Sequence, residues 1–363
     1  MAIFLYGTLA WPPLLRVVAG EDVRLEPAVL SGWRVHGVRG ETHPMITPEP
    51  GAVVKGWRLD AGPQVLARLD FYEAVFGYPR EPFGAFDLYQ PRAAQEPEGT
   101  WSLEAWGKEY GALWVAAAGE IMALMGRDSP AEVAARMGVI RARAQAILLA
   151  QNTAPTTLRH HAEPGDVEVL SHEIPYAKFF SVEEVELTHR RFDGGRNGPL
   201  NRAGFVSVDA ATVLPYDPRR DRVMLIEQFR VGPFLRRDPQ PWVLEPIAGR
   251  IDPGETPEAC ARREAEEEAG ITLEEFIPLG KYYPSPGAKT EFLHAFAAVT
   301  DLPDEAAGQG GGVAGEGEDI RSHILSFDEA LALIETGEIN IGPTMISLLR
   351  LGQIRDGLRA GVA

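Results

Sequence analysis

One stretch of this sequence specifies a helix together with both of its ends. The stretch reads GRIDPGETPEACARREAEEEAGI and runs from Gly249 to Ile271. Thr256 is a favoured N-cap, and Pro257 suits the first helical position because the amide hydrogen that proline lacks has no partner there. Gly270 can end the helix in the left-handed conformation. The pattern therefore predicts a well-capped helix between Thr256 and Gly270.

Four glutamates crowd the second half of this helix: Glu264, Glu266, Glu267 and Glu268. Glu264 and Glu268 are four positions apart and share a face, which Glu267 borders. Like charges this close repel each other, so either bulk water or bound cations must offset the repulsion. A solvated acidic face is the ordinary explanation, whereas several carboxylates in one patch suit hard cations such as Mg²⁺ or Mn²⁺.

The composition indicates two globular domains and argues against two classes of partner. At 363 residues, the chain exceeds what one hydrophobic core usually organises. A net charge of −17 leaves no general basic surface for nucleic acid or an anionic membrane. Cys260 is the only cysteine and cannot form an internal disulfide, which favours a reducing, cytoplasmic compartment. No apolar run is long enough to span a bilayer, and no signal peptide is recognisable.

A polar stretch with two prolines divides the chain. It covers Gln151 to Asp166 and follows an alanine-rich helical pattern from Ala131 to Ala150. His160 and His161 lie in this stretch without a neighbouring cysteine or spaced carboxylate. We therefore interpret them as solvated linker residues rather than metal ligands.

The two halves show different patterns. Before the linker, short apolar runs such as AIFLYGTL and GALWVAAA alternate with turns and predict strands of an α+β or barrel-like domain over residues 1–155. After it, AGFVSVDAATVLPYD and DRVMLIEQFR predict strands joined by a turn, so that residues 165–363 form an α/β domain with a central sheet. The glycine-rich segment from Gly308 to Asp319 is expected to be a mobile loop.

The acidic helix belongs to a longer motif. Its fixed positions are filled in order by Gly249, Glu255, Arg263, Glu264, Glu267, Glu268, Gly270 and Ile271. This motif is the Nudix box, and the sequence from about Val169 to the C-terminus resembles the Nudix hydrolases. The resemblance implies an α/β/α sandwich that hydrolyses a nucleoside diphosphate linked to another group, and it favours bound cations over a solvated acidic face.

Segments on either side of the box look like the ADP-ribose pyrophosphatase branch of that family. They are VMLIEQFR, WVLEPIAG, YYPSPGAKTEF, GEGEDI and FFSVEEVELTHRRFDG. The last of them helps to form a domain-exchanged dimer in that branch, so the resemblance implies a homodimer through the Nudix domain. It also implies Mg²⁺-dependent hydrolysis of ADP-ribose to AMP and ribose 5-phosphate, with Mn²⁺ as a substitute. Another nucleoside diphosphate sugar or a dinucleotide is the alternative substrate.

The resemblance assigns metal and catalytic roles to individual residues. The metal ligands would be the carbonyl oxygen of Ala248 and the carboxylates of Glu264, Glu268 and Glu318, with Glu255 and Glu267 close by. Arg263 would orient these carboxylates through charge-assisted hydrogen bonds. Glu316 would be the general base, since a carboxylate on a mobile loop can take a proton from water once substrate closes the site. An ordinary acidic surface loop is the alternative for Glu316 and Glu318.

Three further residues would bind the nucleotide by the same resemblance. Phe179 would stack on adenine, while Arg202 and Arg230 would contact polar groups of the nucleotide. A core aromatic is the alternative for Phe179, and plain surface charges are the alternative for the two arginines.

The first half carries a second pair of motifs. A glycine turn ends the strand in FLYGTLA, and Glu73 lies in the otherwise apolar run ARLDFYEAVFGYPREPF. A buried carboxylate there would have a raised pKa and would suit a general base near neutral pH, although such a glutamate more often lies on the exposed side of a helix.

Over roughly Ile3 to Ala118, this half resembles the γ-glutamyl cyclotransferase-like (AIG2-like) family. The resemblance implies a mixed β-barrel with helices, in which Glu73 deprotonates the substrate's α-amino group. The backbone N–H groups that would hold the substrate are those of Tyr6, Gly7, Thr8 and Leu9. Cyclotransferase activity as the main function, and a non-catalytic sensor that binds ADP-ribose, are the alternatives to a nucleoside diphosphate hydrolase.

Overall fold

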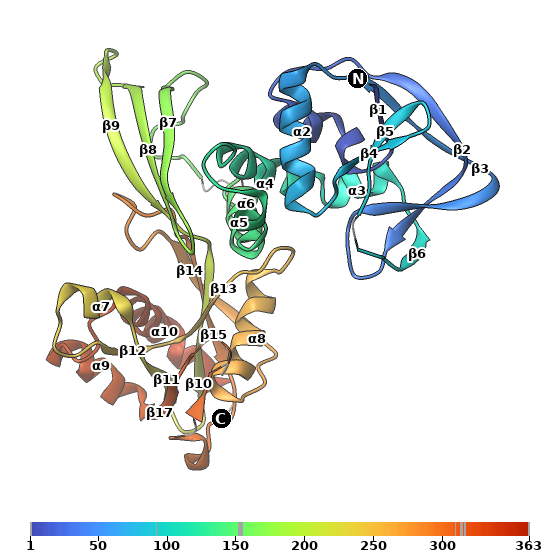
Figure 1. Ribbon diagram of the computed structural model, residues 1–363. Coiled ribbons are helices and arrows are strands. Elements are labelled where there is room, and N and C mark those ends of the chain that lie inside the picture. Colours follow the sequence, from blue (N-terminus) through green and yellow to red (C-terminus); the bar gives the residue numbers. More distant parts are fainter. Residues whose placement is uncertain are drawn as a thin grey trace. The chain divides into compact units, whose positions relative to one another are not determined.

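The protein forms two compact units. The computed structural model describes residues 2–91, 93–151, 155–308, 310–312, 315 and 317–361. The first unit comprises Met1–Glu163 with Ala177–Phe179, and the second comprises Pro164–Tyr176 with Phe180–Ala363. Both contain sheets and helices (Figure 1), which confirms the expected two-domain α+β organisation.

A six-stranded mixed sheet forms the centre of the first unit. Its strand order is β4-β5-β1-β3-β2-β6. The strands are β1 (Ala2–Leu5), β2 (Glu26–Val38), β3 (Pro44–Asp60), β4 (Arg80–Phe83), β5 (Phe86–Tyr89) and β6 (Pro97–Thr100). Only β1 and β5 pair in parallel; the other neighbours are antiparallel. Phe4, Val54 and Leu88 are almost fully buried and form an apolar cluster on this sheet.

Helices complete the first unit. They are η1 (Thr8–Ala10), α1 (Pro12–Ala19), α2 (Pro63–Val75), α3 (Leu103–Glu109), α4 (Gly111–Ala123), α5 (Pro130–Ala134) and α6 (Met137–Leu149). The strand expected for GALWVAAA is therefore wrong, because these residues form most of α4. Alanine is the strongest helix former, and the apolar run is buried as a helix rather than as a strand. The helical pattern from Ala131 to Ala150 is confirmed by α5 and α6.

An eight-stranded sheet lies at the centre of the second unit. Its path is β14-β15-β10-β11-β17-β16, with β12 paired to β11 and β13 paired to β10. The strands are β10 (Ala210–Asp217), β11 (Arg222–Phe229), β12 (Trp242–Glu245), β13 (Ile247–Arg250), β14 (Phe276–Tyr282), β15 (Leu293–Val299), β16 (Gly310–Gly311) and β17 (Ile320–Ser326). The two strands and the turn expected before the acidic helix are thus β10 and β11.

Helices cover both faces of this sheet. They are α7 (Val231–Arg236), α8 (Pro257–Ala269), α9 (Phe327–Thr336) and α10 (Gly342–Ala360). Figure 1 shows α8 on one side of the sheet and α9 and α10 on the other, the sandwich layering that the sequence predicts. Leu214 and Leu225 of the sheet pack with Phe327 of α9 and Leu348 of α10 in one buried core.

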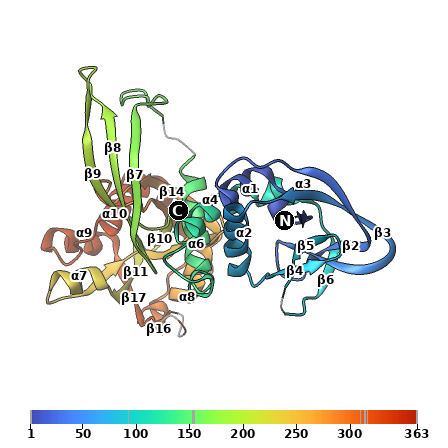
Figure 2. The same ribbon diagram turned by 45° about the horizontal axis from the view of Figure 1, so that its top comes forward.

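A separate antiparallel sheet belongs to the segment that precedes the central sheet. It consists of β7 (Val167–Ala177), β8 (Ser181–Arg190) and β9 (Arg196–Val206), in the order β7-β8-β9. Figure 2 shows these three long strands running side by side. Val167, Val169 and Leu170 of β7 are exposed. No described helix of the protein is long and apolar enough to cross a membrane.

Candidate active sites

The acidic helix α8 is capped as the sequence predicts. The Thr256 side chain accepts a hydrogen bond from the backbone N–H of Ala259 at 3.1 Å. Gly270 ends the helix with φ = 63°, in the left-handed region. Cys260 and Ala265 are fully buried on the face that packs against the sheet. A small residue is therefore what the position of Ala265 can hold. Glu268 is buried on the same helix, whereas Glu266 and Glu267 are exposed.

Glu264 lies against the backbone of Gly249 on β13. A β-carbon added at Gly249 would come within 1.8 Å of Glu264 Oε1 and 1.9 Å of its Cδ. The Glu264 side chain is only 13 % exposed. Burial raises the pKa of Glu264 to about 7, with a further upward contribution from the charges of Glu267 and Glu318. The missing side chain of Gly249 thus provides the space in which this carboxylate is held.

Arg263 donates hydrogen bonds to three glutamates. Its Nε and Nη2 donate to the two carboxylate oxygens of Glu255 at 3.1 and 3.2 Å. Its Nη1 donates to Glu264 Oε1 at 2.5 Å and to Glu267 Oε2 at 3.0 Å. The planar guanidinium can satisfy several carboxylates in this way because its donors form a fixed fork. Arg263 therefore donates hydrogen bonds to Glu255, Glu264 and Glu267.

Glu268 is the most deeply buried of the acidic residues on α8, with 2 % of its surface exposed. Its Oε2 accepts a hydrogen bond from the backbone N–H of Ala248 at 2.9 Å, and its Oε1 accepts from Gln228 Nε2 at 3.4 Å. Burial raises the pKa of Glu268 to about 8, while the nearby positive charge of Arg230 lowers it. Arg230 itself donates from Nε to Glu245 Oε2 at 2.6 Å.

The glycine-rich segment approaches the C-terminal end of α8. A β-carbon at Gly311 would come within 1.8 Å of the backbone oxygen of Glu268, and the N–H of Gly312 donates to the backbone oxygen of Glu267 at 2.9 Å. The sequence predicts a mobile loop from Gly308 to Asp319, whereas Gly310–Gly311 within it pair with β17 as strand β16. Because glycine has no side chain, this segment can lie directly on the helix end.

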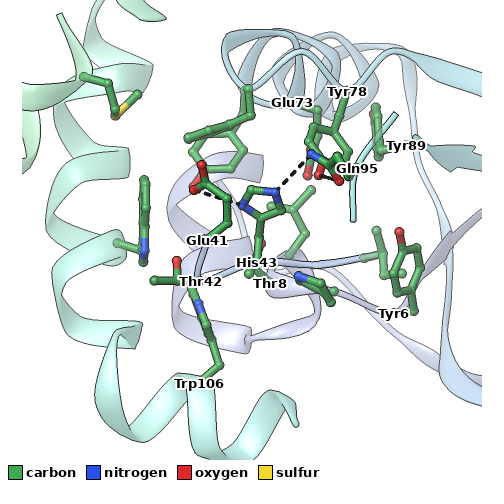
Figure 3. Close-up of a pocket in the computed structure, with 18 of the residues that line it drawn as sticks. Tyr6, Thr8, Glu41, Thr42, His43, Glu73, Tyr78, Tyr89, Gln95 and Trp106 are labelled. Atoms are coloured by element: carbon green, nitrogen blue, oxygen red, sulfur yellow. Dashed lines mark hydrogen bonds and ion pairs between the residues drawn. The ribbon is translucent and has the colours of Figure 1, made fainter. Parts of the chain in front are cut away.

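A second candidate site is a cavity of about 450 Å³ in the first unit. Its lining includes Tyr6, Gly7, Thr8 and Leu9 from the turn after β1, together with Glu73 from α2 (Figure 3). The sequence-predicted turn and the predicted base are therefore brought to the same cavity.

Glu73 is partly exposed to this cavity and is surrounded by tyrosines. Within the described part of the chain, no hydrogen bond or ion pair holds its carboxylate. Burial raises its pKa to about 8. Burial also raises the pKa of four tyrosines, and the charge of Glu73 adds to the rise in each: Tyr6, Tyr72, Tyr78 and Tyr89. This glutamate therefore lines a cavity and is not on an exposed helix face.

A chain of polar contacts crosses the cavity beside Glu73. Tyr78 Oη donates to Gln95 Oε1 at 2.8 Å, and Gln95 Nε2 lies 3.5 Å from His43 Nε2. His43 Nδ1 lies 3.9 Å from a carboxylate oxygen of Glu41. Figure 3 marks these contacts. Burial lowers the pKa of His43, so the neutral ring is favoured. His43 and Gln95 carry no local motif, so the sequence alone does not indicate them.

Comparisons with known proteins place both units. Residues 206–345 match the family model described as NUDIX domain, and residues 3–106 match the one described as Gamma-glutamyl cyclotransferase, AIG2-like. An ADP-ribose pyrophosphatase of Haemophilus influenzae is 36% identical over 191 residues, which cover 52% of this chain and 87% of that protein. The chain belongs to the Nudix hydrolase family.

Other relatives of this Nudix hydrolase carry two different names. An ADP-ribose pyrophosphatase of Escherichia coli strain K12 is 38% identical over 184 residues, covering 51% of this chain and 87% of that protein. A GDP-mannose pyrophosphatase of Shigella flexneri serotype 5b is 39% identical over 150 residues, covering 41% of this chain and 76% of that protein. The resemblances to the Nudix and AIG2-like families found in the sequence are therefore confirmed.

The donors at the Nudix box fit a hard divalent cation in their chemistry. Glu264 and Glu268 offer carboxylate oxygens, and their burial leaves the ionised forms in need of a positive partner. Among the residues that the structure describes, no group of three or more His, Cys, Asp or Glu side chains is arranged to hold a metal ion. Arg263 donates to Glu264, and the N–H groups of Ala248 and Gln228 donate to Glu268.

The remaining predicted residues of the Nudix site differ in their placement. The negative charge of Glu318 contributes to the raised pKa values of Glu264 and Glu268. Glu316 lies outside the described residues. Arg202 is an exposed residue of β9 that donates to the backbone oxygen of Asn201 at 2.8 Å.

Phe179 belongs to the first unit, not to the unit that contains the Nudix box. The Phe179 side chain is 56% exposed, so it is not a core aromatic. Sequence reasoning missed Gln228, although a glutamine in the apolar strand VMLIEQFR is a signal that could have found it.

Proposed function

We propose that the Nudix domain hydrolyses ADP-ribose to AMP and ribose 5-phosphate with Mg²⁺, for which Mn²⁺ can substitute. The observation that carries this proposal is the pair of buried carboxylates Glu264 and Glu268, held beside β13 by the space at Gly249 and by the N–H of Ala248. The names of the two ADP-ribose pyrophosphatases support ADP-ribose as the substrate. Hydrolysis of a nucleoside diphosphate sugar such as GDP-mannose is the alternative, motivated by the third relative.

In this proposal, some residues of the box bind the cation and another orients the carboxylates. Glu264, Glu268 and Glu318, with the carbonyl oxygen of Ala248, would hold the cation. Once bound, the cation would neutralise the diphosphate and lower the pKa of a water molecule. Arg263 would fix the directions of the carboxylates.

The substrate and the attacking water would be handled by residues around the box. Glu267, which Arg263 also contacts, would assist catalysis. Glu316 would accept the proton from the attacking water. Phe179, Arg202 and Arg230 would bind the nucleotide. Arg230 has the strongest support of the three, because its positive charge acts on Glu268 and lowers the pKa of that carboxyl group.

AMP release from ADP-ribose tests this function, with UDP-glucose, NADH and GDP-mannose in parallel, each with and without Mg²⁺. Glu264→Gln should abolish turnover while the fold stays intact. Glu266→Gln is the matched control, since Glu266 is an exposed residue of the same helix. If Glu264→Gln kept the wild-type rate, the metal-site argument would fail. Tight binding of ADP-ribose without turnover would instead indicate a sensor.

The assembly and location follow as further proposals. We expect a homodimer through the Nudix domain, supported by the exposed apolar residues of β7 such as Val167 and Leu170. Light scattering that showed a monomer would contradict this. The single cysteine and the net charge of −17 support a cytoplasmic protein whose partner is a small molecule rather than nucleic acid or a membrane.

The cavity of the first unit supports a second candidate function, γ-glutamyl cyclotransfer. Glu73 would take a proton from the substrate's ammonium group, and the freed α-amine would attack the γ-carbonyl carbon. The C–N bond to the leaving amine then breaks, that amine takes the proton, and the products are 5-oxoproline and a free amine. The N–H groups of the turn from Tyr6 to Leu9 would hold the substrate while this occurs.

Measurement of 5-oxoproline released from γ-glutamyl compounds tests this second function. Glu73→Gln should abolish the release, because glutamine has the same shape but cannot accept the proton. The Nudix activity of the same variant provides the internal control and should stay at the wild-type rate. Equal 5-oxoproline release from wild type and variant would remove Glu73 from the mechanism.

A further inference from the structure

Gln228 is a buried polar residue on an otherwise apolar face of β11. Side chains alternate between the two faces of a strand, so Met224, Ile226 and Gln228 share one face. Met224 and Ile226 are fully buried, and Gln228 is 5 % exposed. A buried amide costs free energy unless it forms hydrogen bonds, and an apolar side chain would avoid that cost. Packing alone therefore does not explain a glutamine at this position.

The amide of Gln228 points at a carboxylate of the Nudix box. Its Nε2 donates to Oε1 of Glu268 on α8 at 3.4 Å, although the two residues are 40 positions apart in the sequence. The other carboxylate oxygen, Oε2, accepts from the backbone N–H of Ala248 at 2.9 Å. Each oxygen of Glu268 thus has a donor, one from a side chain of β11 and one from the backbone of β13.

Glu268 is held differently from the other carboxylates of the box. Arg263 donates to Glu255, Glu264 and Glu267. Glu268 instead accepts from the two donors of the sheet. Because only 2 % of Glu268 is exposed, water cannot readily replace a donor that is lost. The box therefore depends on the sheet for the placement of this one carboxylate.

The two donors define the plane of the Glu268 carboxylate. The terminal torsion of a glutamate side chain has a broad minimum, so the side chain itself does not fix that plane. Each carboxylate oxygen has about two lone-pair directions, so one donor on each oxygen leaves a second direction for a cation. A carboxylate that is already ordered loses less conformational entropy when a cation binds.

We propose that Gln228 is a positioning residue for the cation of the Nudix box. It acts through Glu268 rather than as a ligand. The inference rests on the proposed Mg²⁺-dependent function and adds a residue from outside the box to its cation site. Without the Gln228 N–H, only Ala248 holds the Glu268 carboxylate, which can then turn, so the affinity for a divalent cation falls.

Direct measurement of cation binding tests the inference on the full chain. Gln228→Met and Gln228→Leu keep a large side chain but remove the N–H donor. Gln353→Met is the matched control, because Gln353 is an exposed residue of α10. Mn²⁺ titration followed by electron paramagnetic resonance gives Kd without substrate, and AMP release from ADP-ribose gives kcat and the KM for Mg²⁺. Thermal unfolding followed by circular dichroism shows whether each variant folds.

We expect the Kd for Mn²⁺ and the KM for Mg²⁺ to rise about 10- to 100-fold in both Gln228 variants, the usual effect of losing a partner that orients a metal ligand. Both constants should stay at wild-type values in Gln353→Met. At saturating Mg²⁺, kcat of the Gln228 variants should return to within about 3-fold of wild type, because no catalytic group has been removed. A merely structural role would lower thermal stability and leave the Kd for Mn²⁺ unchanged.

The outcomes separate this inference from the function on which it rests. Wild-type turnover together with an unchanged Kd in the Gln228 variants would overturn the positioning role and leave the hydrolase function in place. A raised Kd in the variants of a protein that hydrolyses no nucleoside diphosphate would support the positioning role and reject the function. Loss of the fold in both Gln228 variants, or no Mn²⁺ binding in wild type, would overturn the positioning role.

Discussion

The carboxylate of Glu264 occupies the place where Gly249 would carry a side chain. Its Oε1 lies 1.8 Å from the position of an ideal β-carbon on Gly249, far inside any real contact distance. Glu264 also belongs to the contact network of Arg263, which connects it to Glu255 and Glu267. The first glycine of the Nudix box and its central glutamate are thus one structural unit, although they are fifteen positions apart in the sequence.

Gly249→Ala should expel the Glu264 carboxylate from its position. The new β-carbon would clash with the carboxyl group and Cγ of Glu264. The Glu264 side chain must then rotate away, and its hydrogen bond with Arg263 is lost. We expect AMP release from ADP-ribose to fall by about 100-fold or more, with a destabilisation of about 1–3 kcal/mol from overpacking. Gly232→Ala is the control, because a β-carbon there meets nothing within 4 Å. Wild-type turnover in Gly249→Ala would show that the observed position of Glu264 is not the active one.

Arg263→Lys should keep the positive charge and lose the fixed, forked arrangement of N–H donors that the guanidinium provides. A lysine ammonium cannot donate to Glu255, Glu264 and Glu267 in the same directions, so the carboxylates lose their alignment. We expect kcat/KM for ADP-ribose to fall by about 10- to 100-fold. Arg262→Lys is the neighbouring control, since Arg262 donates to the backbone oxygens of Leu273 and Glu274 instead. An equal loss in both variants would point to a general effect on helix α8.

The sequence predicted α8 and its contacts because their signals are local or part of a dense motif. Thr256 and Gly270 identify the two caps, and the box spacing brings Arg263 to its glutamates. The alanine-rich helix α4 was misread as a strand, because a short apolar run has no periodicity that separates the two.

The cavity of the first unit could be predicted only in part. The glycine turn and Glu73 were found from family motifs, whereas His43 and Gln95 were not. These two residues are 52 positions apart and meet only once the sheet has formed. Arg141 of α6 lines the same cavity and is likewise not indicated by the sequence around it.

Gly311→Ala should separate the glycine-rich segment from α8. The added β-carbon would meet the backbone oxygen of Glu268, which cannot move aside as a flexible side chain could. We expect the Nudix kcat to fall by about 10-fold or more because the segment that carries Glu318 is displaced. Gly315→Ala, where a β-carbon meets nothing within 4 Å, should stay near the wild-type rate. Equal Nudix kcat values in the two variants would show that the contact between Gly311 and α8 does not matter for catalysis.

The pH dependence of 5-oxoproline release should follow Glu73. Only the ionised carboxylate can accept a proton, and burial raises its pKa to about 8. We therefore expect kcat/KM for a γ-glutamyl substrate to rise about tenfold per pH unit below that value and to level off above it. A profile that levelled off near pH 5 would mean that Glu73 is not the group that titrates. Circular dichroism of the same protein, measured across the same range, shows whether the chain stays folded.

Glu73 should also make the stability of the first unit depend on pH. Its pKa is raised from 4.5 to about 8 in the folded state, so the folded protein holds the proton more tightly. The resulting stabilisation is fully present below pH 4.5 and is lost as pH rises through about 8. Glu73→Gln cannot titrate, so its free energy of unfolding should exceed that of wild type by about 1–3 kcal/mol more at pH 9 than at pH 5, allowing for water that reaches the partly exposed carboxyl. Urea unfolding followed by tryptophan fluorescence measures this difference, with exposed Glu104→Gln as the control. A difference that does not change with pH would show that Glu73 is ionised in the folded protein throughout this range.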